Sequence, residues 1–283
     1  VLKVGYDRPL HYLLLYGLAK ALGPYDAVRA LALTPLLLYT LASYLLAREL
    51  WGGRVASLAA AVAPATYTAT AGLFGALYGN WTALATSLFA CTAGIRWLRR
   101  GGTAWLALYL LLTAVAVGVH VYMGAVAFAA TLLFLAAAAT RKGYRRRALA
   151  ALALQLAIAA VGLYAWERYF SAHAVRGPLS ITLLNVNLWR RRTAAVKLFS
   201  EQWWSDFCFA IYRYAATAAL DPAVWLLTTL AVAALGFQDL GGFLLAPWMA
   251  LTALLALTAP SSLIYRSLLD FPYSLAAAVG LTY

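Results

Sequence analysis

Residues 7–54 read DRPLHYLLLYGLAKALGPYDAVRALALTPLLLYTLASYLLARELWGGR, and two apolar runs in this stretch decide the fold. The run from Ala30 to Ala47 approaches the ~20 residues that a helix needs to cross a bilayer, so it predicts a transmembrane helix. The run from Leu13 to Gly23 is too short for a span. Its leucines share one helical face, which predicts a helix lying on the external membrane surface: Leu10, Leu13, Leu14 and Leu18.

The composition indicates an integral membrane protein. Of the 283 residues, 65% are hydrophobic and 11% are charged, whereas a soluble domain carries about 25% charged residues. We therefore predict an all-α, polytopic transmembrane helical bundle in the cell membrane, with membrane lipid as a partner. The net charge of +13 is not interpreted as nucleic-acid binding, because Lys and Arg cluster in short loops beside apolar runs, as cytoplasmic loops do.

Further apolar runs extend the bundle to about 8–9 spans within a single domain, residues 1–283. Residues 1–29 would form the end of a first external loop and the juxtamembrane helix, and residues 167–221 a long external loop. The additional runs are Val55–Leu77, Trp81–Trp97, Trp105–Val119, Met123–Ala139, Ala148–Trp166, Val224–Phe237, Leu244–Leu257 and Leu263–Tyr283.

Charge predicts the orientation. Three basic segments are expected on the cytoplasmic side: Arg48–Arg54, Arg96–Arg100 and Arg141–Arg147. The nearly neutral corners between them are then external: Asp26, Asn80, His120 and Glu167. The 167–221 segment is basic yet falls on the external side, which favours an anionic ligand there.

Asp7, Arg8, His11 and Tyr12 form the densest polar group on the predicted external side. Transfer from a phosphate-linked sugar needs a carboxylate to accept the acceptor's proton and cations to neutralise the leaving phosphate. Asp7 suits the first role, and Arg8 or His11 the second. The alternative is a solvated loop in which Asp7 and Arg8 only pair with each other.

The order of residues in this region resembles the glycosyltransferase-C superfamily. The matching segments are Asp7-Arg8-Pro9-Leu10-His11-Tyr12, a short leucine helix, Ala27-Val28-Arg29-Ala30-Leu31, an apolar run, and Leu46-Ala47-Arg48-Glu49-Leu50-Trp51-Gly52. The branch it resembles most comprises protein mannosyltransferases and aminoarabinose transferases, which use polyprenyl-phosphate sugars. Where that family usually has two prolines, this chain has Pro9 alone.

The resemblance implies an inverting hexosyltransferase that moves a sugar from a polyprenyl-phosphate donor to a protein or lipid acceptor. It implies a catalytic role for Asp7. It also implies that the chain is a fragment without the N-terminal helix, with the principal catalytic acid upstream of Val1. No cofactor is expected, and no set of metal ligands is recognised. Whether the reaction uses a divalent cation stays open.

Further candidate residues lie along the chain. His120 and Tyr122 interrupt two apolar runs and would bind substrate with His11 and Tyr12, or would form an ordinary polar turn. Arg190, Arg191 and Arg192, flanked by aromatic residues, would bind the donor phosphate or merely attract anionic lipid. For His120 and Tyr122 the resemblance adds some support, because members of the superfamily often carry a His-x-Tyr pair at a hairpin of this kind.

Arg266 and Asp270 are spaced to pair within the last apolar run. Arg266 would bind the donor phosphate, in line with a Tyr-Arg that the superfamily often has, or would form a structural pair. Asn80-Trp81-Thr82 matches a glycosylation sequon. The alternative functions are a lipid or solute transporter, including a flippase, and a non-catalytic membrane subunit.

Overall fold

The computed structural model describes residues 9–66, 69, 72, 77–172, 200–201, 204–205, 208, 239–258 and 271–282. Every regular element in these ranges is helical, which confirms the all-α prediction. The elements are α1 (Pro9–Leu22), α2 (Pro24–Trp51), α3 (Gly53–Val62), a 3-10 turn (Ala63–Ala65), α5 (Tyr78–Arg100), α6 (Thr103–Val119), α7 (Val121–Ala139), α8 (Arg145–Ala172), α12 (Leu240–Thr258) and α14 (Tyr273–Gly280).

Three of the described helices are long and apolar enough to cross a membrane: α2, α7 and residues Arg145–Ala165 of α8. The total of about 8–9 spans expected from the sequence stays a prediction. Shorter apolar helices cover Leu10–Leu22, Gly53–Ala65, Thr103–Val119 and Leu240–Leu255. The predicted span over Val224–Phe237 lies outside the described residues, as does the first part of Leu263–Tyr283.

The apolar run Val55–Leu77, which Pro64 and several Thr residues interrupt in the sequence, is also interrupted in the structure. α3 ends at Val62, and the chain then makes a 3-10 turn and turns extended at Thr66. Pro64 explains the break, because proline has no N–H to donate and its ring obstructs a continuing helix. At 10 residues, α3 is about 15 Å long, half of the hydrocarbon thickness.

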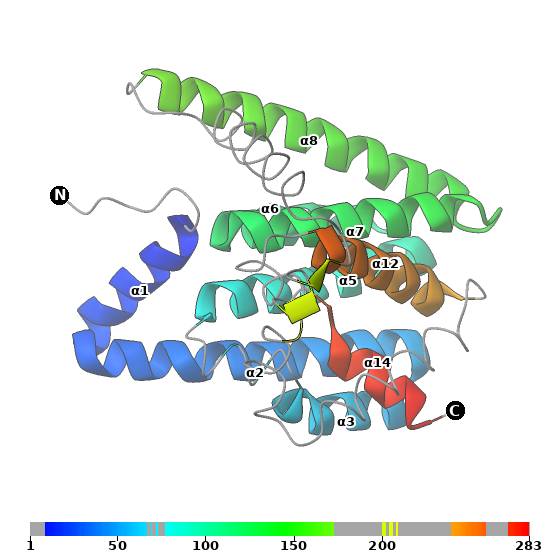
Figure 1. The fold of residues 1–283 in the computed structure, drawn as a ribbon. Coiled ribbons are helices and arrows are strands. Elements are labelled where there is room, and N and C mark those ends of the chain that lie inside the picture. Colours follow the sequence, from blue (N-terminus) through cyan, green and yellow to red (C-terminus); the bar gives the residue numbers. More distant parts are fainter. Residues whose placement is uncertain are drawn as a thin grey trace.

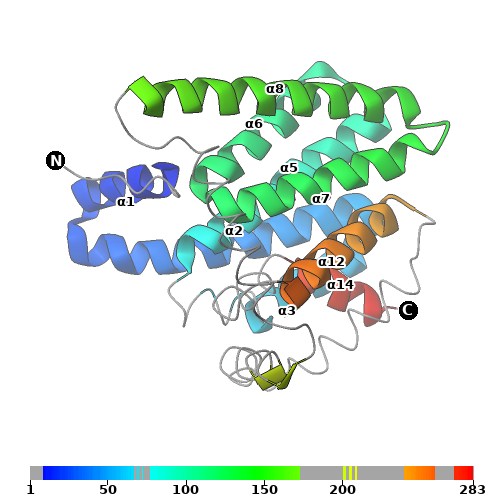
Figure 2. The same cartoon turned by 45° about the horizontal axis from the view of Figure 1, so that its top comes forward.

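Helix α5 occupies the centre of the bundle, between α2 and the α6–α7 pair (Figures 1 and 2). Its surface is built largely from Ala, Gly, Ser and Thr, so neighbouring backbones approach closely. A Cβ on Gly94, for example, would be 3.0 Å from the Tyr109 ring of α6. The short turn at Gly101 and Gly102, both with positive φ, returns the chain from α5 into antiparallel α6.

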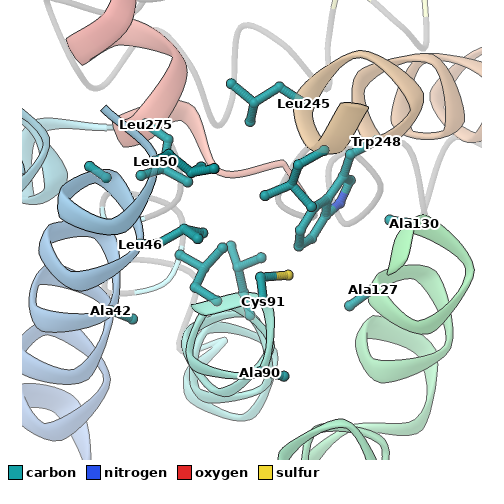
Figure 3. Close-up of a cluster of buried hydrophobic side chains, with 14 of the residues drawn as sticks. Ala42, Leu46, Leu50, Ala90, Cys91, Ala127, Ala130, Leu245, Trp248 and Leu275 are labelled. Atoms are coloured by element: carbon teal, nitrogen blue, oxygen red, sulfur yellow. The ribbon is translucent and has the colours of Figure 1, made fainter. Parts of the chain in front are cut away.

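The apolar core lies where α2, α5, α7, α12 and α14 meet (Figure 3). Trp248 of α12 is fully buried there, and Cys91 of α5 is fully buried beside it as a small packing residue. Two buried polar bridges join helices that are distant in sequence. Ser274 of α14 lies 2.8 Å from the Ser43 hydroxyl and donates to Tyr39 at 3.0 Å. Gln155 of α8 accepts from the Tyr109 hydroxyl and donates to Thr131.

Candidate functional site

The two ends of the bundle differ in chemistry. One end, on the right in Figure 1, gathers the three basic segments, and we call it the basic end. The other end gathers the start of α1, the start of α5 and the turn between α6 and α7, and we call it the His corner. The predicted substrate-binding residues that the structure describes are all at the His corner.

Glu49 connects two of the three basic segments, 48–54 and 96–100. Its carboxylate accepts from Arg96 Nε at 2.9 Å and from Arg100 Nη2 at 3.1 Å, and Arg99 Nη1 lies 3.9 Å away. Only 7% of the Glu49 side chain is exposed. The arginines thereby join the end of α2 to the end of α5.

The helix ends at the basic end are also capped by arginines. Arg147, at the start of α8, donates to the carbonyl oxygens of Leu98 at 2.8 Å and Arg99 at 3.1 Å. Arg99 in turn donates to the backbone oxygen of Glu49. Cations at helix C-termini are favourable, because the last carbonyl groups there lack intrahelical partners and carry partial negative charge. The segments predicted on one side of the membrane therefore lie together.

His120 forms the turn at the His corner. It is the single residue between α6 and α7, its backbone is extended, and it is 2% exposed. The Met123 N–H donates to His120 Nδ1 at 3.3 Å, so this nitrogen caps α7. Because Nδ1 accepts, the proton of the neutral imidazole is on Nε2, which is a hydrogen-bond donor.

The turn around His120 is tight. A Cβ on Gly124 would lie 2.3 Å from the Cα of Val117 and 2.7 Å from the carbonyl carbon of Ala116. These contacts are with backbone, which cannot move aside as a flexible side chain can. Glycine at position 124 therefore lets α6 and α7 approach closely directly after the turn.

Helix α1 brings His11 to the same corner. Its first residues pack on the end of α6, where a Cβ on Gly118 would be 2.7 Å from Leu10 Cδ1. His11 is buried at 7% exposure, and the ring of half-buried Tyr12 is 6.1 Å away, edge to face. The exposed part of the predicted leucine face, with Leu13 at 60% exposure, points away from the bundle, whereas Leu10 packs on α6. A helix on the membrane surface presents such a face to hydrocarbon.

Asn80, in the first turn of α5, faces this corner. It is two helical turns before Ser87 and four before Gly94, which puts all three on one side of α5. Gly94 abuts Tyr109 of α6, and Ser87 shares a small gap with Ala116 of α6 and Gly124 of α7. Since α5 and α6 are antiparallel, Asn80 is level with the α6–α7 turn.

The Asn80 side chain is fully buried, and neither its nitrogen nor its oxygen has a hydrogen-bond partner in the described part of the chain. The same is true of the Trp81 indole nitrogen. Complete burial also corrects the sequon interpretation, because a glycosylation acceptor must be accessible.

The remaining predicted residues divide into two groups. Tyr122 is half-buried and packs against the core, and Asp26 pairs with exposed Arg29 at 3.6 Å in the first turn of α2. Other predicted residues lie outside the described part, so their predicted roles stay predictions: Asp7, Arg8, Arg190, Arg191, Arg192, Arg266 and Asp270. Within the described ranges, no group of three His, Cys, Asp or Glu side chains could hold a metal ion.

Sequence reasoning missed Glu49 as the organiser of the basic end, although one signal was present. Glu49 is the single acid in the three basic segments, and an acid among so many arginines predicts pairing. Sequence reasoning placed Asn80 on the same side as His120 but missed that the Asn80 side chain is fully buried. Comparison of the chain with protein-family models, with curated proteins and with solved structures finds no match.

Proposed function

We propose that the chain is a membrane glycosyltransferase that moves a sugar from a polyprenyl-phosphate carrier to an acceptor on the extracytoplasmic face. One observation carries the proposal. Helix α1 and the α6–α7 turn are far apart in sequence, yet they bring His11 and His120 to one end of the bundle, opposite the basic end. If the basic end is cytoplasmic, as the positive-inside rule requires, the His corner is external.

The chemistry needs few groups. The acceptor hydroxyl loses its proton to a carboxylate, its oxygen bonds to the anomeric carbon, and the bond from that carbon to the carrier phosphate breaks. Asp7, four residues before His11, is proposed as an acid/base residue. Arg8, Arg190, Arg191, Arg192 and Arg266 are proposed to neutralise the leaving phosphate.

His120 is proposed to bind a sugar hydroxyl or a phosphate oxygen. Its Nε2–H is a donor whose direction is set by the Nδ1 hydrogen bond to Met123. A donor held in this way needs no reorganisation when substrate binds. His11, Tyr12 and Tyr122 would complete the substrate contacts. These roles match the resemblance.

The test is transfer of radiolabelled sugar from a polyprenyl-phosphate hexose by the chain reconstituted in proteoliposomes. His120→Asn is the informative variant, because asparagine also caps a helix but lacks the imidazole Nε2–H. We expect the rate of transfer to fall at least about tenfold, which is equivalent to about 1.4 kcal/mol of transition-state stabilisation. The free energy of unfolding should change little. Gly17→Ala on α1, where an added Cβ meets nothing within 4 Å, is the control.

Asp7→Asn and Arg266→Ala test the two remaining roles, and both are expected to reduce turnover. Transfer at the wild-type rate in both variants would reject the assigned roles. A wild-type chain that binds the donor without transferring sugar would favour the non-catalytic subunit. Movement of an unmodified lipid or solute across the proteoliposome membrane would favour the transporter.

A further inference from the structure

The basic end carries many more cationic than acidic side chains. The segments 48–54, 96–100 and 141–147 contain ten Arg and Lys side chains and a single acid, Glu49. Glu49 is already shared among arginines 96, 99 and 100. Arg141 and Lys142, in the turn from α7 to α8, are exposed and extend this charge toward α12.

A hollow of about 480 Å³ opens beside this turn, between the end of α7 and the first turn of α12. It is lined by Ala137, Thr140, Arg141 and Phe243. The Arg141 guanidinium lies 5.5 Å from the centre of the Phe243 ring. The lining therefore combines one cation, one hydroxyl and two apolar side chains.

The Thr140 hydroxyl adds a second requirement on the ligand. It donates to the Ala137 carbonyl oxygen at 2.7 Å, so toward the hollow it can only accept a hydrogen bond. The nearby acid Asp239 accepts from the Gly242 N–H at 2.7 Å as the cap of α12. A ligand matching the hollow would offer an anionic group to Arg141, a donor to Thr140 and carbon to Phe243.

We propose that this hollow binds the headgroup of an anionic phospholipid that carries a hydroxyl group, of which phosphatidylglycerol is the simplest example. The phosphate would bind the Arg141 guanidinium, and the glycerol hydroxyl would donate to Thr140. α7 is one of the helices long and apolar enough to span the bilayer, so its end at Ala139 lies near headgroup depth. Phe243 and Ala137 would contact the glycerol backbone and the first acyl carbons.

This location agrees with the physics of the inner membrane surface. Anionic lipid attracts cationic residues, and each Lys or Arg near the surface strengthens binding about fivefold. That attraction does not distinguish Arg141 from Lys142. The hollow does, because Arg141 lines it and Lys142 does not.

The experiment uses the full chain in nanodiscs of phosphatidylcholine with increasing phosphatidylglycerol. The readout is the phosphatidylglycerol retained after dilution into pure phosphatidylcholine. Arg141→Gln and Lys142→Gln remove the same charge from neighbouring exposed positions. We expect Arg141→Gln to weaken retention at least about tenfold and Lys142→Gln about fivefold or less. Arg29→Gln, at the opposite end and paired with Asp26, should weaken retention no more than Lys142→Gln does.

Thr140→Val supplies a second, charge-neutral test. It should reduce retention of phosphatidylglycerol but not of phosphatidic acid, which has no headgroup glycerol. Equal effects of Arg141→Gln and Lys142→Gln would reduce the site to general surface attraction and overturn the proposal. Competition by inorganic phosphate at similar concentration would overturn it too, since that would show that the lipid portion is not recognised.

Discussion

Glu49→Gln is the sharpest test of how the basic end is held together. The substitution keeps the size of the side chain but removes the one negative charge on which arginines 96, 99 and 100 converge. Arg99 also donates to the backbone oxygens of Glu49 and Leu50 at the end of α2, so the effect should extend beyond one ion pair. Without the Glu49 carboxylate, the three guanidinium groups stay close together and partly desolvated with no negative charge among them.

The magnitude follows from the geometry. Arg96 lies closest, at 2.9 Å and 28% exposure, and its charge-assisted hydrogen bond contributes about 2 kcal/mol. Arg100 is 63% exposed, so its contribution is about 0.5 kcal/mol. Arg99 Nη1, at 3.9 Å from the carboxylate, adds little. We expect Glu49→Gln to lower the free energy of unfolding by about 2–3 kcal/mol.

The assay is equilibrium unfolding of the purified chain in mixed detergent micelles. Asp26→Asn is the matched control, because it also neutralises one acid that pairs with an arginine. In that pair, however, the side chains of Asp26 and Arg29 are both largely exposed. It should cost less than about 0.5 kcal/mol. Equal losses in the two variants, or a loss below about 1 kcal/mol for Glu49→Gln, would refute the reasoning. A double-mutant cycle with Arg96→Gln measures the coupling directly.

Three further outcomes are expected. Gly124→Ala should destabilise the chain by at least about 2 kcal/mol, because the added Cβ meets backbone at 2.3 Å, whereas Gly17→Ala in open space should be neutral or stabilising; unfolding in micelles compares them. Asn80→Leu keeps the number and branching of side-chain heavy atoms and should raise stability by about 1–3 kcal/mol, since it removes a buried amide that has no hydrogen-bond partner among the described residues; a loss in the same assay would contradict this. Cys91 should resist maleimide in the native state and react only on unfolding, and mass spectrometry measures the modification.

The sequence predicts a helix well where the length and composition of an apolar run are enough to identify it. The runs Trp105–Val119 and Met123–Ala139 appear as α6 and α7, separated by His120 as expected. Pro9 and Pro24 open α1 and α2, which fits the preference for proline in the first turn of a helix. Apolar runs and prolines in the first turn of a helix act locally, so the folded chain keeps the helices that they predict.

The sequence does not predict which face of each helix is inside. In a membrane protein, lipid is as apolar as the core, so hydropathy cannot distinguish the exposed Leu13 of α1 from the buried Leu88 of α5. The partners of Glu49 and the direction of Asn80 depend on how α5 rotates between its neighbours. Small residues on α5 were the available signal for its central place, but they do not give its rotation.

The central place of α5 has a consequence for biogenesis. At 23 residues the helix is long enough to span, yet it is not apolar enough to be counted among the three helices that qualify on length and composition. Such a segment partitions weakly into lipid by itself. We therefore expect its insertion to wait for α6 and α7 to emerge from the ribosome, so that a chain truncated after Gly102 leaves α5 outside the bilayer.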